Sequence, residues 1–285
     1  MKFDVVIGNP PYNDNVYLDF IEKGHGLLKE DGNLIMITPA KFIYRLSEQD
    51  KAFKAGMLKH FSDMVYFLDA GDVFDIRLQG GVAYFVMNKR NNKQMRVMNC
   101  CEKQPLLDSN GEWQLRDVEE HMVIHNDTAL SVCNKLGVFD KDFSACKCAY
   151  VPVDGNWNLF IASVNGISSS GKTSSNILSN SGNMTVLGPI TVTNDGNFGS
   201  PDIRCFFSAR TKEEADSYAS YLNTKLVRFM LLLRMCSYHN DNPSTWKFVP
   251  EQEVYDHIYS DAELYAKYKL SDAEIALVEA SVVAR

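Results

Sequence analysis

The sequence predicts an α/β protein in which a largely parallel sheet comes first and a loop-rich part follows. Phe3–Gly8 contains three adjacent β-branched residues, which is typical of a buried parallel strand. Helical patterns then alternate with further apolar runs to about residue 90, as in a doubly wound sheet. Residues 165–197 are instead rich in Gly, Ser and Asn, which favours loops and short strands. The 285 residues suffice for one large domain or two ordinary ones.

Each expected element has a local signal in the sequence. Ser47 is a suitable N-cap for a helix that runs to about residue 60. Two apolar runs at residues 64–68 and 81–87 are separated by a loop alone, which predicts an antiparallel hairpin at the edge of the sheet. The other elements expected are a helix at residues 14–29, strands at 34–38, 159–161 and 191–193, a long helix at 211–236 and a capping box at 271–274.

Composition excludes several classes of protein. No apolar run is long enough to span a bilayer, and the N-terminus has no signal-peptide core, so we expect a cytoplasmic protein with no membrane partner. The seven cysteines lack paired zinc spacing, which predicts reduced structural thiols and no metal site. A net charge of -7 argues against nucleic-acid binding, but the region after Pro250, with eight acidic and three basic residues, carries most of it.

The tetrapeptide Asn9-Pro10-Pro11-Tyr12 follows the first strand directly. Neither proline can donate a backbone hydrogen bond, so the chain leaves the sheet stiffly at a strand's carboxyl end, where open α/β sheets bind ligands. The side-chain oxygen of Asn9 and the carbonyl of Pro10 are suited to accept the two hydrogens of an exocyclic amine. The ring of Tyr12 is suited to stack on a planar base.

This tetrapeptide resembles motif IV of the N6-adenine-specific DNA methyltransferases of restriction–modification systems, the Asn-Pro-Pro-Tyr class. Protein-glutamine N5 methyltransferases and some RNA methyltransferases share the four letters. The downstream sequence favours the DNA enzymes. Further segments similar to that family lie at residues 32–42, 69–74, 80–85, 221–225, 248–250 and 263–265.

The resemblance implies a partial Rossmann-like methyltransferase sheet, with the later strands only, followed by a loop-rich α+β target-recognition domain. It divides the chain into a catalytic half at residues 1–92, a recognition-like domain at 93–245 and an acidic helical tail at 246–285. The family's glycine-rich cofactor loop would precede Asn9. We therefore expect this chain to lack the N-terminal cofactor-binding half, and its cofactor-binding residues are unknown.

The implied function is methyl transfer from S-adenosylmethionine to N6 of an adenine flipped out of double-stranded DNA. Asn9, Pro10, Pro11 and Tyr12 are the implied catalytic residues, and Tyr12 and Phe74 the base-stacking walls. We expect the chain to be inactive alone and to need a second polypeptide with the cofactor half, or self-association. The alternatives are a non-catalytic DNA-recognition remnant and an RNA or protein-glutamine methyltransferase.

Other candidate residues carry weaker signals. Residues 166–173 match the P-loop pattern literally, but a poor helix follows, which favours a loop near DNA over a nucleotide site. Basic residues around the long predicted helix are candidate phosphate contacts: Arg204, Arg210, Lys225 and Arg228. We also expect the outer edge of Phe3–Gly8 to be covered by another polypeptide, another copy or a substitute strand, because an unpaired apolar edge promotes association.

Overall fold

The computed structural model describes residues 1–45, 47–67, 70–72, 74, 78, 81–91, 94–101, 104–106, 110–116, 124, 127–148, 150–162, 186–195, 203–234 and 243–282. The chain forms two compact units, Met1–Asp127 and Thr128–Arg285. Both units combine helices with a sheet, which confirms a mixed α/β class. The first sheet is mixed and not largely parallel, and its partial Rossmann-like arrangement stays a prediction. The finer division at residues 92 and 245 stays a prediction.

Unit 1 contains the elements that were predicted for the first part of the chain. Its helices are α1 (Val16–Gly26), α2 (Lys41–Tyr44) and α3 (Glu48–Met57), with short 3-10 turns at Leu58–His60 and Ala70–Asp72. Its strands are β1 (Phe3–Gly8), β2 (Leu28–Pro39), β3 (Phe61–Phe67), β4 (Val82–Asn88), β5 (Met95–Cys101), β6 (Gln104–Leu106) and β7 (Gln114–Arg116).

The sheet of unit 1 has the order β1-β2-β4-β3-β5-β6, and β7 also pairs with β5. The pairs β1–β2 and β3–β5 are parallel, whereas β4 is antiparallel to both β2 and β3. The predicted antiparallel hairpin is therefore present. Its predicted place at the sheet edge is wrong, because β5 adds a further strand beside β3.

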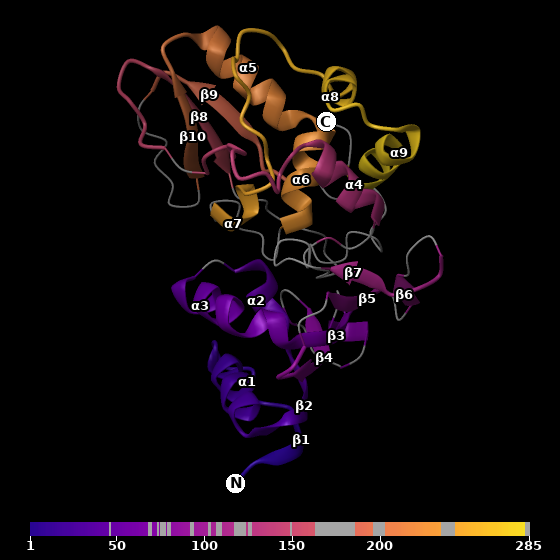
Figure 1. Cartoon of the computed structure of the whole chain (residues 1–285). Coiled ribbons are helices and arrows are strands. Elements are labelled where there is room, and N and C mark those ends of the chain that lie inside the picture. The colour runs from indigo at the N-terminus through magenta and orange to yellow at the C-terminus, as the bar shows by residue number, and fades with distance from the viewer. Residues whose placement is uncertain are drawn as a thin grey trace. The chain divides into compact units, whose positions relative to one another are not determined.

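Three helices cover one face of this sheet (Figure 1). Gly24 of α1 lies so close to the sheet that a Cβ there would be 2.8 Å from Leu34 Cδ1. Behind α2 and α3, the ring of Phe61 contacts Phe85 at a centroid distance of 4.7 Å and Phe42 at 6.0 Å. Phe85 is fully buried. The covered face is the hydrophobic core of unit 1.

The first helix is shorter than the sequence predicts. It ends at Gly26, and β2 begins at Leu28, opposite Phe3 of β1. The backbone N–H of Phe3 donates to the Leu27 carbonyl at 2.9 Å, which draws this segment into the sheet. Pairing with β1 therefore overrides the helical apolar pattern of residues 27–29.

Unit 2 has a three-stranded antiparallel sheet and six helices among its described residues. The strands are β8 (Trp157–Ala162), β9 (Ile190–Thr193) and β10 (Ile203–Ala209), in the order β10-β8-β9. The helices are α4 (Asp127–Lys135), α5 (Lys212–Asn223), α6 (Lys225–Arg234), α7 (Pro243–Trp246), α8 (Asp261–Lys267) and α9 (Asp272–Ser281). The strands predicted at residues 159–161 and 191–193 are confirmed.

The long helix predicted at residues 211–236 is two helices. Thr224 has an extended conformation, with ψ at 149°, and separates α5 from α6. Its hydroxyl donates to the Tyr221 carbonyl at 2.7 Å and accepts from the Val227 N–H at 3.4 Å, so one side chain serves the ends of both helices. The Leu226 N–H then bonds Asp261 Oδ1 at 3.0 Å. These contacts compensate for the broken helical hydrogen bonds.

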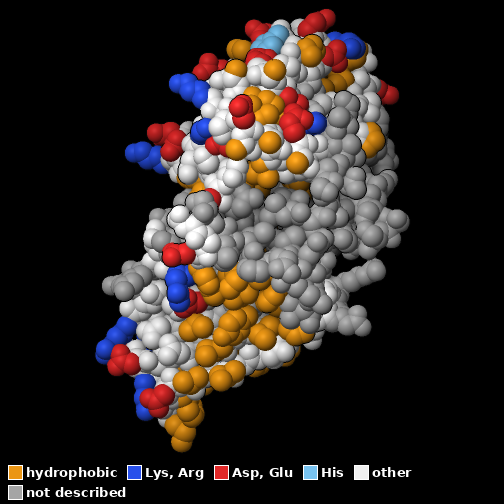
Figure 2. Space-filling view, turned by 90° about the vertical axis from the view of Figure 1, so that its right-hand side faces the viewer, with side chains coloured by type: hydrophobic (Ala, Val, Ile, Leu, Met, Phe, Trp, Pro, Cys, Tyr) orange, Lys and Arg blue, Asp and Glu red, His pale blue; other side chains and the backbone are white. Residues whose placement is uncertain are grey.

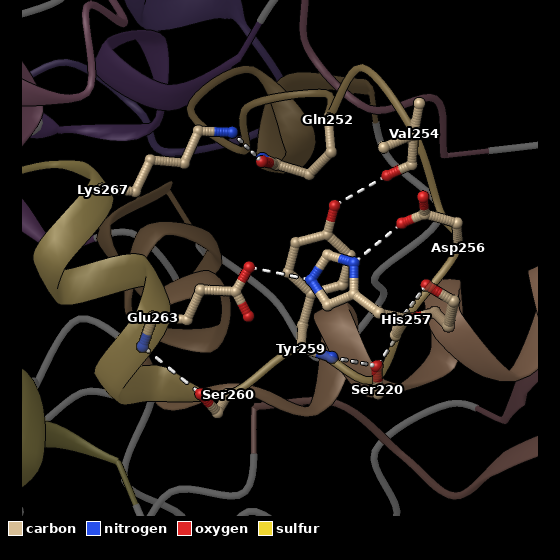
Figure 3. Close-up of polar contacts among 10 residues, drawn as sticks. Ser220, Gln252, Val254, Asp256, His257, Tyr259, Ser260, Glu263 and Lys267 are labelled. Atoms are coloured by element: carbon tan, nitrogen blue, oxygen red, sulfur yellow. Dashed lines mark hydrogen bonds and ion pairs between the residues drawn. The ribbon is translucent and has the colours of Figure 1, made fainter.

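The acidic C-terminal segment is held on α5 by specific polar contacts (Figure 3). The Tyr259 N–H donates to Ser220 Oγ at 2.9 Å, and the Tyr259 hydroxyl donates to the Val254 carbonyl at 2.7 Å. The side chain of Ser260 then caps α8 by accepting the Glu263 N–H. The predicted capping box of Ser271 is confirmed at the start of α9.

The described helices contain no segment that is long and apolar enough to cross a membrane.

Candidate active site at the carboxyl edge of the sheet

The loop after β1 carries the predicted catalytic residues. Asn9 and Pro11 are exposed, Pro10 is buried and Tyr12 is half-buried. Burial raises the pKa of Tyr12, so its hydroxyl stays protonated at neutral pH. The buried Pro10 anchors the loop, while the amide of Asn9 is open to a ligand.

The strand directions bring three loops to one edge of the sheet. Strands β1, β2 and β3 run the same way, because β1 pairs parallel with β2 and β4 is antiparallel to β2 and β3. The segments that follow these strands are residues 9–15, 40–45 and 70–74. In the third segment the Phe74 N–H donates to the Ala70 carbonyl at 2.8 Å, and the Phe74 side chain is half-buried. The topology thus brings Tyr12 and Phe74 to the same edge, and their joint contact with a base stays a prediction.

Two buried tyrosines connect the second of these segments to the end of β3. The hydroxyl oxygens of Tyr44, at the end of α2, and Tyr66, near the end of β3, are 2.5 Å apart. Both side chains are almost completely buried. This buried hydrogen bond between α2 and β3 restrains the edge of the sheet on which the candidate site lies.

The segment after Tyr12 is fixed by α2 and α3. The side-chain oxygen of Asn15 accepts from Arg45 Nη1 at 3.1 Å, and its amide nitrogen donates to Gln49 Oε1 at 3.1 Å. Lys54 Nζ donates to the Arg45 carbonyl at 3.0 Å and holds the turn between the two helices. The sequence gives no local signal for the contacts of Asn15, because its two partners are 30 or more positions away.

Comparison with known proteins gives two partial sequence matches. Residues 13–74 match the family described as Eco57I restriction-modification methylase, from the residue after Tyr12 to Phe74. An alignment over 116 residues, which covers 34% of this chain, is 34% identical to an "Uncharacterized adenine-specific methylase" of Mycoplasma pneumoniae. The chain is similar to restriction–modification adenine methylases. We call residues 13–74 the methylase segment.

The chain spans only part of the length of these relatives. The matched region covers 26% of the Mycoplasma pneumoniae protein. Among solved structures, the methyltransferase subunit of a type I restriction-modification system from Streptococcus thermophilus aligns over 43% of this chain and 31% of its own, with 13% identity and a TM-score of 0.29. The M protein of the type I restriction enzyme EcoKI aligns over 42% and 29%, with 17% identity and a TM-score of 0.28.

The four basic residues predicted to contact phosphates differ in availability. Arg228 is only 1% exposed, and its Nε donates to the Asn223 carbonyl at 3.1 Å, so it is a structural residue and the prediction for it is wrong. Lys225 is already paired with Glu279, which makes it a weak candidate. Arg210 is exposed and stays a prediction, and the side chain of Arg204 lies outside the described residues.

The cysteine side chains that the structure describes, Cys100, Cys133, Cys146, Cys148 and Cys205, are buried. Burial raises the pKa of the Cys146 thiol to about 12, so it carries no thiolate at neutral pH. No group of three or more His, Cys, Asp or Glu residues suited to a metal ion occurs in the described part of the chain. The P-loop-like residues 166–173 lie outside it.

Proposed function

We propose that this chain is the catalytic and DNA-recognition component of a site-specific DNA methyltransferase that acts on adenine N6 in a restriction–modification system. The observation that carries this proposal is the position of Asn9–Tyr12. This loop ends a parallel strand directly before the methylase segment, and its amide is exposed beside a half-buried tyrosine. The substrate that suits these groups is an adenine flipped out of double-stranded DNA, because N6 is otherwise buried by pairing and stacking.

In this proposal the loop acts on the amino group of the base. Asn9 Oδ1 and the Pro10 carbonyl accept the two N6 hydrogens, while the ring of Tyr12 stacks on one face of the base and Phe74 on the other. Two acceptors favour a pyramidal nitrogen with its lone pair available to a methyl group. Because these hydrogen bonds strengthen as N6 becomes positive, they stabilise the transition state more than the bound substrate.

The proposed methyl donor is S-adenosylmethionine, as the adenine-methylase relatives suggest. The described residues do not form a recognisable site for it. The strand-to-helix turns after β1 and β2 contain no glycine, although a nucleotide-binding turn uses glycines to let the backbone approach the ligand. We therefore assign this chain the base-binding half of the reaction and propose that another polypeptide or another copy completes the enzyme.

The function is tested on DNA from the host in which this gene acts with its natural partners. Long-read sequencing should detect N6-methyladenine at one DNA sequence motif, and Asn9→Ala should remove it while the amount of the chain stays unchanged. The matched control is Asn13→Ala, because Asn13 is also an exposed asparagine. Asn158→Ala is not a suitable control, because Asn158 is buried and hydrogen-bonded. Methylation that persists in Asn9→Ala would contradict the proposal.

A further inference from the structure

The two faces of the unit 1 sheet differ in how far they are covered. Hydrophobic side chains are visible over the strands of one face (Figure 2), where Ile7 is 75% exposed. The helices α1, α2 and α3 cover the other face (Figure 1). Two polar residues of these helices, Tyr17 of α1 and Asp50 of α3, are both 0% exposed. Their side chains are therefore sealed from solvent within the covered layer.

Each of these two side chains has a buried polar atom without a hydrogen-bond partner in the described part of the chain. The atoms are the hydroxyl oxygen of Tyr17 and Oδ1 of Asp50. The other carboxylate oxygen of Asp50, Oδ2, accepts the hydroxyl of Ser47. A buried polar group that stays unmatched destabilises the fold by its full desolvation cost, and such groups are rare in folded proteins. Both atoms therefore require a partner.

The first turns of α1 and α3 bring Tyr17 and Asp50 into one junction. The side-chain amide of Asn15, just before α1, donates to Oε1 of Gln49, the residue before Asp50, at 3.1 Å. Burial raises the pKa of Tyr17, and the nearby carboxylate of Asp50 raises it further. The backbone of Phe42 lowers this pKa as a hydrogen-bond donor, so it cannot accept the hydroxyl hydrogen. The junction thus contains an unmatched donor beside an unmatched acceptor.

The charges around this junction favour a neutral partner over a cation. The guanidinium of Arg45 lowers the pKa of Tyr17, opposite to the effect of Asp50, so it also lies close to the junction. Lys54 follows Asp50 by one turn of α3, on the same helix face, and is only 2% exposed. Its Nζ donates to the Arg45 carbonyl at 3.0 Å. Two positive groups thus already compensate the carboxylate of Asp50.

From these observations we infer that Tyr17 and Asp50 hold one buried water molecule between them and that this bridge positions the loop Asn9–Tyr12. Water is the smallest neutral group that both accepts and donates a hydrogen bond. It accepts from the Tyr17 hydroxyl and donates to Asp50 Oδ1, within the range of about two to four hydrogen bonds that buried waters make. Each unmatched atom thereby gains its partner.

The first turn of α1 connects this bridge to the loop. The Val16 N–H donates to the Asn13 carbonyl at 3.2 Å, so the turn that contains Tyr17 begins directly after Tyr12. The buried Pro10 anchors the loop on the side of the sheet, and the bridge restrains the side of α1. Tyr17 and Asp50 are therefore positioning residues. The importance of the loop rests on the proposed function, whereas the bridge itself does not.

The sign of the effect of Tyr17→Phe distinguishes a bridged hydroxyl from an unmatched one. Removal of an unmatched buried hydroxyl leaves stability unchanged or increases it, whereas removal of a bridged one leaves the water and Asp50 short of a partner. We expect the α1 amides of the full chain to exchange their hydrogens about fivefold faster in this variant, as the loss of one net hydrogen bond predicts. Unchanged or slower exchange would overturn the inference.

NMR spectra of the same variants test whether the bridge positions the loop. The side-chain amide signals of Asn9 and the ring signals of Tyr12 should shift in Tyr17→Phe. They should stay in place in the matched control Tyr218→Phe, which removes a buried tyrosine hydroxyl from unit 2. In an Asp50→Ala background, Tyr17→Phe should have little further effect, because the bridge is already lost. Loop signals that do not move, or that move equally in the control, would overturn the positioning role.

A high-resolution crystal structure of the full chain tests the water directly. We expect one ordered water about 2.7–3.2 Å from both the Tyr17 hydroxyl and Asp50 Oδ1. None of these measurements uses a ligand, so their results do not depend on whether the loop binds adenine. A direct hydrogen bond between the two side chains, or two atoms with no water between them, would overturn the inference.

Discussion

The guanidinium Nη1 of Arg45 donates to Oδ1 of Asn15 at 3.1 Å, which connects the turn between α2 and α3 to the start of α1. Asn15 lies three residues after Tyr12, so this hydrogen bond anchors the far end of the candidate catalytic loop. The same asparagine donates to Gln49 on α3. The conformation of the loop thus depends on residues far from it in the sequence.

Arg45→Met should loosen the loop without unfolding unit 1. A hydrogen bond to a charged group contributes roughly 1.5–3 kcal/mol, and partial exposure of this pair places the expected loss of stability at the lower end. Denaturant unfolding measures this loss, and the NMR signals of Asn9 and Tyr12 report the loop. Arg90→Met is the matched control, because Arg90 pairs with Asp31 at the other end of the sheet. Loop signals that change equally in both variants would show that Arg45 does not position the loop.

Asn9→Ala should reduce methyl transfer far more than DNA binding in the enzyme assembled with its natural partners. Removing one donor or acceptor that acts on developing charge lowers the rate by about 10²–10³. The affinity for DNA should change little, because backbone contacts supply most of it. Single-turnover methylation and DNA titration measure the two quantities separately. Equal losses in both would mean that Asn9 only maintains the loop.

Several parts of this fold were predictable because their signals are local. The β-branched residues of β1 and the N-cap Ser47, whose Oγ accepts the Asp50 N–H, act within a few positions. The break at Thr224 was not predictable, since no proline or glycine marks it and Asp261 stabilises it from a distance. The burial of Arg228 likewise depends on tertiary packing.

In the candidate site, too, some features follow from adjacent residues and others from contacts between distant segments. The base-binding chemistry could be inferred from the tetrapeptide alone, because the groups that would bind the base are adjacent in the chain. The contacts of Asn15 with Arg45 and Gln49 join three separate segments and carry no sequence pattern. The half-exposure of Ile35 and Ile37 was not predictable either, since these residues have the composition of a strand buried on both sides.

Unit 1 should lose stability in mild acid through the contact between His25 and His60. Their ring centroids are 4.4 Å apart, and burial together with the neighbouring His60 lowers the pKa of His25 to about 4. The unfolded chain takes up this proton near pH 6.5, so the stabilising contribution is present above 6.5 and is lost as the pH falls toward 4. NMR titration of the His25 Cε1 proton gives the pKa directly, and a value near 6.5 would contradict this burial.

The C-terminal unit should show the opposite pH dependence at His257. Its Nδ1 lies 2.8 Å from Asp256 Oδ1 and its Nε2 lies 2.8 Å from Glu263 Oε1 (Figure 3). These hydrogen bonds, to Asp256 and then Glu263, raise the pKa of His257. Its contribution is therefore complete below pH 6.5 and is lost as the pH rises through the elevated pKa. Thermal unfolding of His257→Gln should depend less on pH between 6 and 8 than that of the wild-type chain.

The isolated chain should bind S-adenosylmethionine weakly or not at all. The described strand-to-helix turns after β1 and β2 lack the glycines that a nucleotide-binding turn needs. Isothermal calorimetry on the full chain measures this affinity. A dissociation constant in the micromolar range would show that the chain has its own cofactor site.

The most direct test of the central claim compares two nucleosides by NMR titration of the isolated chain. 2′-Deoxyadenosine carries both N6 hydrogens, whereas its N6,N6-dimethyl derivative carries none and keeps the ring that stacks on Tyr12. We predict that deoxyadenosine shifts the side-chain amide signals of Asn9 and binds about tenfold more tightly, since two hydrogen bonds contribute about 0.5–1.5 kcal/mol each. Asn9→Ala should reduce this difference. Equal affinity for the two nucleosides in the wild-type chain would contradict the assignment of Asn9–Tyr12 as an adenine N6 site.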